Sequence, residues 1–255
     1  MLVSVIMPTY NCGKYIAQSL DSVISQTVTD WEVRIVDDCS TDDTYSVVLP
    51  YLEKYPNIHY YVLPENGGPA VARTEAIKRA NGKYIAFLDS DDLWDSEKLE
   101  KQIAFMEKNG ADFSATGYRW MDEDGNDLHT ALIPPKKTDY KKMILLSNPI
   151  GNLSVMYNQE ALGKFEVPPI KKRNDFALWL KILKKTDCCY GMEEILGTYR
   201  MGRSGSVSSN KLKQAKYHWQ LYHDIEGHNV FRSLYEIACW AFVKGTGIGI
   251  NKTKM

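Results

Sequence analysis

The sequence has few cysteines, and its composition excludes several protein classes. Its five cysteines are odd in number and contain no Cys-x-x-Cys pair. This argues against a disulfide framework or a zinc cluster and favours a reducing compartment. No apolar run reaches the roughly 18–20 residues of a membrane span, and the N-terminus lacks the basic region of a secretion signal. We therefore expect a cytoplasmic protein.

Neither positive nor negative charge predominates in the sequence, with 31 Lys and Arg against 32 Asp and Glu. The net charge of the 255 residues is -1, so nothing draws the chain toward nucleic acid. The five histidines have no spacing typical of metal ligands, since His218 and His223 are five residues apart. With 44% hydrophobic and 25% charged residues, the chain is ordinary globular protein. Its length suits one large domain, or one domain with a small addition.

The first 110 residues alternate between predicted strands and helices. Short connections between them indicate a parallel sheet with right-handed crossovers and helices on both faces, an α/β fold. Ligands of such sheets bind at the carboxyl ends of the strands. The predicted strands cover residues 2–7, 31–36, 58–63 and a run beginning at 83, with helices beginning near 11–13, 40–43 and 69.

One of these strands, residues 84–88, ends abruptly at three carboxylates, Asp89, Asp91 and Asp92. Clustered like charges repel one another, so a cation is expected there. Hard oxygen ligands suit Mg²⁺ or Mn²⁺. The alternative is a loop followed by a helix N-cap, a common use of aspartate. Because polar residues also follow the first two strands, at 8–11 and 37–38, we expect a site at this edge.

The second half of the chain is less regular. The pattern predicts helices at 96–108 and 175–185, strands at 113–121 and 153–157, a hairpin turn at 122–126 and an edge strand at 194–200. The residues 133–140 and 168–174 are predicted to be loops.

Four ordered motifs carry a resemblance to a known family. They are residues 5–11 (VIMPTYN), 36–42 (VDDCSTD), 66–73 (NGGPAVAR) and 87–92 (FLDSDD). In this order and spacing they resemble the family 2 inverting glycosyltransferases of the GT-A fold, bacterial polysaccharide type. The match is close over residues 2–95 and looser to about 209. It implies a mostly parallel central sheet with helices on both faces.

The resemblance implies a nucleotide-sugar donor, usually a UDP-sugar, and a divalent cation, Mn²⁺ or Mg²⁺. Asp91 would hold the metal, and Asp89 would contact the ribose or a metal-bound water, with Ser90 among the donor-binding residues. The remaining implied donor contacts are Pro8 and Tyr10 around the base, Asp38 as an acceptor from the base, and Arg73 near the nucleotide. Arg73 could otherwise form a surface salt bridge on its helix.

The resemblance also implies a catalytic base, for which inversion needs a carboxylate. Asp175 stands at the matching place, with Asn174 where the family usually has Glu. The alternative for Asp175 is an ordinary helix N-cap. The preceding residues 171–173 form either a basic lip for a phosphate-bearing acceptor or a solvated loop.

Arg200 and Arg203 could pair with phosphate oxygens in a loop that closes over the diphosphate in many relatives. Some relatives carry a metal-binding His in this loop, and this sequence does not. The Gln-x-x-Arg-Trp motif of processive synthases is also absent. We therefore expect one sugar to be transferred in each encounter.

The C-terminal residues differ in character from the rest. Aromatic residues with flanking Lys and Arg predict two helices within 211–245, after a catalytic domain of residues 1–209 (nucleotide half 1–95, acceptor half 96–209). We interpret 210–255 as a helical extension. It would form a peripheral contact with the inner face of the membrane, pack on the core, or form a homodimer contact.

The sequence therefore predicts a metal-dependent glycosyltransferase acting on a saccharide or lipid-linked acceptor. The alternative is a catalytically silent nucleotide-sugar-binding protein of the same fold, motivated by Asn174. A nucleotidyltransferase is disfavoured because no glycine-rich phosphate loop follows the first strand. The sequence does not identify the sugar or the linkage.

Overall fold

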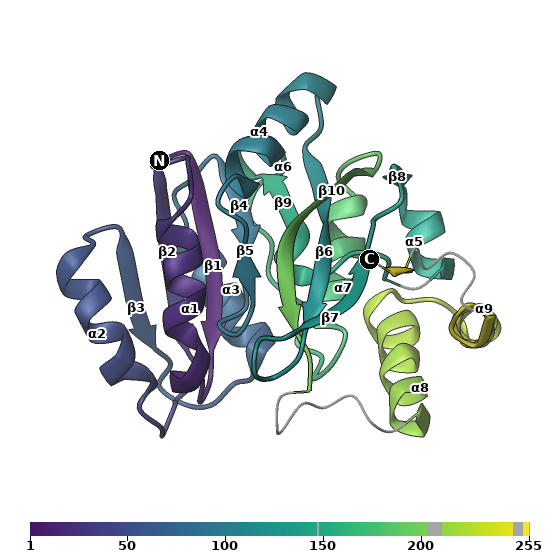
Figure 1. Ribbon diagram of the computed structural model, residues 1–255. Coiled ribbons are helices and arrows are strands. Elements are labelled where there is room, and N and C mark those ends of the chain that lie inside the picture. The colour runs from purple at the N-terminus through teal and green to yellow at the C-terminus, as the bar shows by residue number, and fades with distance from the viewer. Residues whose placement is uncertain (147, 203–210, 247–251, 255) are drawn as a thin grey trace.

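The computed structural model describes residues 1–146, 148–202, 211–246 and 252–254. The described strands form one sheet with helices on both faces (Figure 1). Along its main path the strand order is β11-β7-β6-β9-β4-β1-β2-β3. The predicted α/β fold with a C-terminal helical extension is confirmed.

The first half of the chain is the parallel part of the sheet. Here β1 (Val3–Thr9) pairs in parallel with β2 (Trp31–Asp37) and β4 (Tyr84–Phe87), and β2 pairs in parallel with β3 (Ile58–Val62). Every residue of β1 and β4 is buried, as expected for strands covered on both faces. The crossovers are α1 (Gly13–Ile24), α2 (Thr44–Lys54) and α3 (Pro69–Arg79).

The second half extends the sheet with mixed pairing. Strand β9 (Val155–Asn158) runs antiparallel to both β4 and β6 (Phe113–Met121) and so joins the two halves. A hairpin connects β6 to β7 (Asp127–Leu132). The other elements are β5 (Leu93–Trp94), α4 (Lys98–Asn109), β8 (Lys137–Thr138), α5 (Tyr140–Leu146), a 3-10 turn (Asn152–Ser154), α6 (Gln159–Leu162), α7 (Asn174–Leu183) and β10 (Cys189–Arg200).

Two predictions about this half were wrong. The strand predicted at 194–200 is not an edge strand, because β10 pairs with β5, β6 and β8. Its exposed Glu193 and Glu194 gave it the pattern of an edge. The segment predicted as a loop at 133–140 contains β8 and leads directly into α5.

Each face of the sheet has its own hydrophobic core. On one face α1 and α4 pack through residues such as Leu20 and Leu99, both fully buried. On the other face the core is formed with α3, α5 and α7. Trp179 of α7 lies at its centre, 5.0 Å from the ring of Phe87 on β4. The helix that begins with Asn174 is therefore anchored directly on the central strand.

The C-terminal extension packs on this second core. It consists of α8 (Lys211–Trp219), a π-helix η2 (Gln220–Ile225), α9 (Val230–Thr246) and β11 (Lys252–Lys254), which pairs with β7. Leu221 and Tyr222 of η2 are fully buried members of the core. In Figure 1, α8 and α9 lie at the side of the molecule opposite α2 and β3. Among the described residues, no helix is both long enough and apolar enough to cross a membrane.

Candidate active site

Parallel pairing brings three polar loops to one edge of the sheet. The amide of Asp38 donates to the carbonyl of Thr9 (2.9 Å), and the amide of Leu88 donates to the carbonyl of Ile6 (3.1 Å). The residues that follow β1, β2 and β4 are therefore neighbours at the carboxyl edge. This is where the sequence predicted a site.

Asp38 orders the glycine loop in front of α3. Its two carboxylate oxygens accept hydrogen bonds from the amides of Gly67 (2.7 Å) and Gly68 (2.8 Å). Gly68 has a φ of 82°, a backbone conformation that favours glycine. Burial raises the pKa of Asp38. Each oxygen keeps a second acceptor position, so the predicted contact with a base stays a prediction.

The loop after β1 offers an aromatic ring and a link to β4. Tyr10 is 47% exposed, whereas Pro8 is buried within β1. The thiol of Cys12 donates to the carbonyl of Ser90 at 3.3 Å and so ties the two loops together. The Ser90 residue is itself buried. An exposed ring beside a buried proline suits the stacking expected of a base pocket.

The three carboxylates after β4 have different environments. Asp89 is partly exposed and accepts from Arg73 Nη2 (2.8 Å) and Asn152 Nδ2 (2.9 Å). Asp91 is half-buried. Asp92 is fully inside the protein, and its Oδ1 accepts from the amide of Arg200 at 2.9 Å. Burial, Asp91 and Asp89 raise the pKa of Asp92 well above its ordinary value. Asp92 therefore bonds to β10 and does not cap the next helix.

Arg73 joins this edge to the start of α7. Its guanidinium donates to Asp89 through Nη2 and to Asn174 Oδ1 through Nη1 (2.7 Å). The side chain is buried, with only 6% exposed, so the surface salt bridge considered for it is wrong. Asp175 follows in the first turn of α7, and Asn148 Nδ2 donates to its Oδ2 at 3.2 Å. One side chain thus binds both Asp89, 16 positions away in the sequence, and Asn174, 101 positions away.

Arg200 is buried and its guanidinium donates to protein oxygens. Nε donates to the carbonyl of Asp91 (3.0 Å), Nη1 to that of Glu123 (2.9 Å) and Nη2 to Gln18 Oε1 (2.7 Å). It therefore holds the backbone of the metal-binding candidate Asp91 in this structure. A direct contact with phosphate stays a prediction, and Arg203 lies outside the described residues.

The residues fit a cation held mainly by the substrate. Among the described residues, no group of three or more His, Cys, Asp or Glu side chains could hold a metal by itself. Asp91, which the resemblance implies as the metal ligand, is half-buried at the end of β4. Mg²⁺ and Mn²⁺ are commonly held by one or two carboxylates plus substrate phosphates, so this donor set is compatible with such an ion.

Sequence reasoning missed several residues of the site. Asn148 and Asn152 lie between α5 and β9, where no motif marked them. Tyr199 on β10 is 41% exposed, and its ring lies 6.2 Å from that of Tyr118. Burial is the main cause that raises the pKa of Tyr199. The negative charges of Asp92, Asp89 and Asp91 raise it further, so the phenol lies near these carboxylates. Only the tertiary structure brings these residues to the edge.

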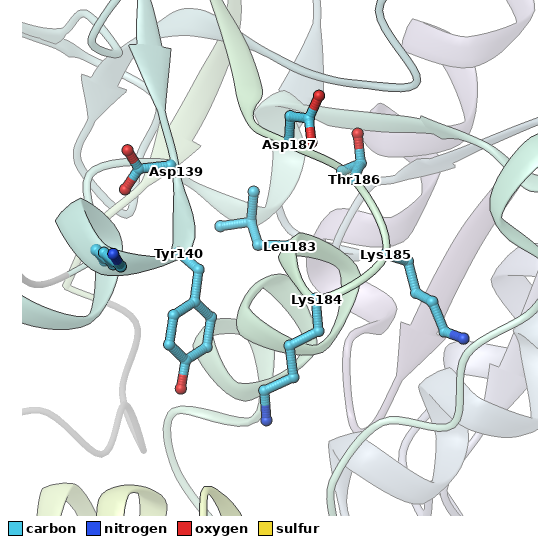
Figure 2. Close-up of a pocket in the computed structure, with 8 residues that line it drawn as sticks. Asp139, Tyr140, Leu183, Lys184, Lys185, Thr186 and Asp187 are labelled. Carbon is cyan, nitrogen blue, oxygen red and sulfur yellow. The ribbon is translucent and has the colours of Figure 1, made fainter.

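A hollow of about 520 Å³ lies apart from this edge (Figure 2). It is lined by the start of α5 and by the last residue of α7 with the turn that follows, including Lys184 and Lys185. Asp175 is at the other end of α7, and a helix of this length spans about 15 Å. The hollow is therefore not part of the candidate site.

Comparison with known proteins identifies the family. The sequence pattern of glycosyl transferase family 2 matches residues 4–167. The putative teichuronic acid biosynthesis glycosyltransferase TuaG of Bacillus subtilis is 44% identical over 251 residues, covering 98% of this chain and 97% of TuaG. The Escherichia coli UDP-Glc:alpha-D-GlcNAc-diphosphoundecaprenol beta-1,3-glucosyltransferase WfgD is 37% identical, covering 92% of this chain and 90% of WfgD.

Solved structures share the fold at low sequence identity. Staphylococcus aureus TarS 1-349 in complex with UDP-GlcNAc has a TM-score of 0.72 at 23% identity, covering 94% of this chain and 72% of that one. The mannosyltransferase PcManGT of Pyrobaculum calidifontis, in complex with GDP-Man and Mn²⁺, has a TM-score of 0.66 at 17% identity, covering 96% and 74%. By its family match and its full-length similarity to TuaG and WfgD, the chain belongs to glycosyl transferase family 2.

Proposed function

We propose that this protein is an inverting glycosyltransferase of cell-surface polysaccharide synthesis. It would transfer a sugar from a UDP-sugar to a hydroxyl of a saccharide or lipid-linked acceptor. The observation that carries the proposal is the link made by Arg73 between Asp89 and Asn174. That link joins the candidate donor edge to the helix that carries the candidate base. TuaG is named for teichuronic acid biosynthesis and WfgD for transfer from UDP-Glc to a GlcNAc-diphosphoundecaprenol, which supports the pathway, the UDP-sugar donor and the lipid-linked acceptor.

The donor would bind along the carboxyl ends of β1, β2 and β4. Tyr10 would stack on the base beside Pro8, and Asp38 would accept a hydrogen bond from it. Because the amides of Gly67 and Gly68 hold the Asp38 carboxylate, this acceptor is already oriented. Asp89, oriented by Arg73 and Asn152, would contact the ribose or a metal-bound water, and Ser90 would be among the donor-binding residues.

Asp91 would hold a divalent cation, Mn²⁺ or Mg²⁺, with the donor diphosphate. When bound, the ion neutralises charge on the leaving nucleoside diphosphate. Arg200 keeps the Asp91 backbone in place through its carbonyl. The protein's own part in this step is to orient one carboxylate at the end of β4.

Asp175 would act as the general base. As the acceptor oxygen forms its bond to the sugar's anomeric carbon, the bond from that carbon to the diphosphate breaks, and the acceptor proton passes to the Asp175 carboxylate. Asn148 orients this carboxylate through Oδ2. Arg73 and Asn174 fix the turn from which it projects.

A panel of nucleotide-sugars with Mn²⁺ tests the proposal by thermal shift and by transfer. The true donor should raise the melting temperature, because a ligand bound only to the folded state stabilises it by mass action. Transfer to a diphospholipid acceptor carrying one sugar should follow with the same donor. If the wild-type protein binds the donor but neither transfers its sugar nor hydrolyses it, the result would favour a silent nucleotide-sugar-binding protein.

A further inference from the structure

Helix α9 carries several large apolar side chains on its outer face. Phe231 is 86% exposed, Tyr235 61%, Phe242 62% and Leu234 53%. These positions, together with the exposed Ala238, are three, four or seven residues apart and so lie on one face of the helix. We call these five residues the outer stripe. Such a contiguous apolar surface is unusual on a soluble protein and marks an interaction site.

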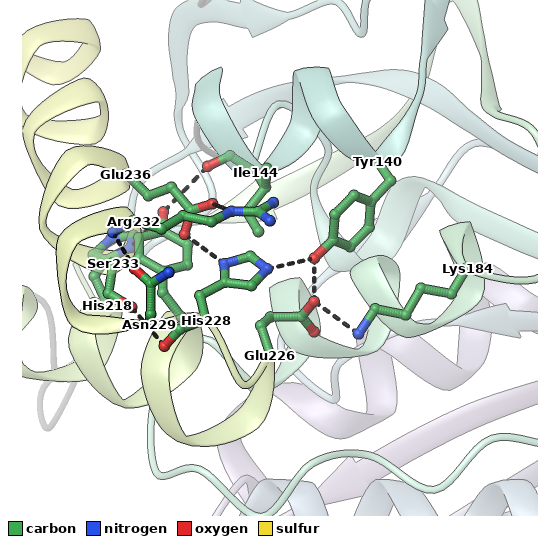
Figure 3. Close-up of polar contacts among 11 residues, drawn as sticks. Tyr140, Ile144, Lys184, His218, Glu226, His228, Asn229, Arg232, Ser233 and Glu236 are labelled. Carbon is green, nitrogen blue, oxygen red and sulfur yellow. Dashed lines mark hydrogen bonds and ion pairs between the residues drawn. The ribbon is translucent and has the colours of Figure 1, made fainter.

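The opposite face of α9 is partly polar and is buried. Its buried residues are Ser233, Glu236, Trp240 and Val243. The Glu236 side chain is only 2% exposed, and its carboxylate pairs with His228 Nδ1 (2.8 Å) and Arg232 Nε (3.0 Å) (Figure 3). If α9 rotated to bury the outer stripe, these ionic contacts would be lost. The stripe therefore belongs on the outside of this chain.

A second buried carboxylate joins the extension to the catalytic fold. Glu226 pairs with Lys184 at the end of α7 (2.8 Å) and accepts from the hydroxyl of Tyr140 on α5 (Figure 3). His228 Nε2 lies 3.5 Å from the same hydroxyl. α9 is thus fixed relative to α7, the helix on which Asp175 stands.

Charge on α9 indicates what would cover the stripe. Glu236 is the one acidic residue of α9, and it is buried and paired. Arg232 and Lys244 are exposed residues, but Arg232 pairs with Glu236 and the Lys244 ammonium lies 5.4 Å from the ring of Trp240. α9 therefore has an excess of basic over acidic charge and no exposed acid, and an apolar face on such a helix complements an anionic lipid surface.

The size of the stripe disfavours a second protein copy. Exposed aromatic and aliphatic side chains of this number amount to about 500 Å². A standard protein interface buries about 800 Å² on each partner. Shallow insertion of one helix face into a bilayer has no such requirement.

We propose that the outer stripe of α9 docks the protein on an anionic lipid bilayer. Because the segment that leads into α9 is joined to the end of α7 through Glu226 and Lys184, docking would hold the candidate base at a fixed position relative to the lipid surface. This inference rests in part on the proposed lipid-linked acceptor. It takes up one of the alternatives expected for the C-terminal helices and assigns the contact to α9, because Leu221 and Tyr222 of η2 are buried in the core.

Vesicle co-sedimentation of the full chain tests the docking face. We expect binding to vesicles of phosphatidylethanolamine and phosphatidylglycerol, and weaker binding to phosphatidylcholine alone. The double variant Phe231→Ser/Phe242→Ser should lower the partition coefficient by about ten-fold or more, since it removes most of the inserting aromatic area. The matched control Leu49→Ser/Leu128→Ser removes two exposed leucines from α2 and β7 and should bind like the wild type.

Each outcome decides the inference. Unchanged partition of the Phe231→Ser/Phe242→Ser variant, or no vesicle binding by the wild type, would overturn it. A concentration-dependent dimer that this variant abolishes, without vesicle binding, would assign the stripe to a second copy. A water-soluble, short-chain diphospho-acceptor separates membrane docking from the proposed transferase function, because transfer to it does not require a membrane. Vesicle binding without transfer to any acceptor would support the docking face and contradict only the proposed function.

Discussion

Carboxylates that look alike in the sequence have different roles in the structure. Asp89 is oriented by Arg73 and Asn152, Asp92 is buried against the amide of Arg200, and Asp38 holds a glycine loop. The clustering of Asp89 and Asp92 could be predicted, because it is local in the sequence. Their partners could not, because these come from α3, β10 and the α5–β9 connection.

The link made by Arg73 gives the first prediction. Arg73→Lys replaces a planar fork by a single ammonium, which cannot reach both Asp89 and Asn174. We expect the free energy of unfolding to fall by about 2 kcal/mol and transfer to slow by at least about ten-fold, because the two parts of the site are displaced. Chemical denaturation and steady-state kinetics measure these effects.

Arg79→Lys on the same helix is the matched control. Arg79 pairs with Glu75 at the surface of α3, where ion pairs contribute less than about 1 kcal/mol. If Arg73→Lys behaved like Arg79→Lys in both measurements, the bridge would not hold the site together.

His218 gives a prediction about pH. This residue is fully buried, and burial lowers its pKa from 6.5 to about 3, with Arg173 and Lys244 acting in the same direction. The unfolded chain therefore binds a proton that the folded chain does not, and stability falls as the pH drops from about 6.5 toward 3. Between pH 7 and pH 5 His218 should account for about 2 kcal/mol of this loss.

Denaturation of His218→Phe at the two pH values isolates this contribution. The variant should lose about 2 kcal/mol less than the wild type over the same interval. His129→Gln, at an exposed position, should lose as much as the wild type. An equal loss in all three proteins would mean that His218 is not neutral in the folded state.

At the scale of elements, the strands and helices of the first half were predictable from their own residues. Buried runs such as Val3–Thr9 and amphipathic runs such as Gly13–Ile24 carry their structure locally. The extension was predictable as helices, but not which face each helix buries. The orientation of α9 depends on the ion pairs of Glu236 with His228 and Arg232. Which residues pair with Glu236 is decided by the folded structure and not by the local sequence pattern.

Leu221 and Leu234 test which side chains of the extension pack in the core and which lie at the surface. Leu221→Ala removes a fully buried core side chain and should lower the free energy of unfolding by about 2–5 kcal/mol. Leu234→Ala removes a 53% exposed side chain and should change it by less than about 0.5 kcal/mol. Equal effects would contradict the packing of η2 into the core. Removing residues 211–255 altogether should destabilise the protein, so point variants are the better probes of membrane docking.

At the scale of the molecule, the candidate site forms where the parallel first half of the sheet meets the mixed second half. The order of four motifs predicted the fold and one edge of the site. The central place of β10 was missed because its exposed glutamates imitate an edge strand. The predicted boundary near residue 209 falls outside the described residues, and the extension on its far side shares a core with the rest.

Removal of divalent metal is predicted to affect the molecule only through the donor. We expect EDTA to abolish most of the thermal stabilisation by a UDP-sugar and to leave the melting temperature of the free protein unchanged, because no complete metal cage is found among the described residues. Asp91→Ala should remove the Mn²⁺ dependence of UDP binding. Equal UDP affinity of the wild type with and without Mn²⁺ would sink the metal assignment.

The proposed role of Asp175 as the base, at a site that Arg73 holds together, can be tested by a single comparison of two proteins. The turnover number and the donor dissociation constant of Asp175→Asn are measured beside those of the wild type. We predict a fall in turnover of about 10²–10⁴-fold, with donor affinity within about two-fold, since the proposed base would contact the acceptor and not the nucleotide. Wild-type turnover in Asp175→Asn, with donor binding intact, would contradict it.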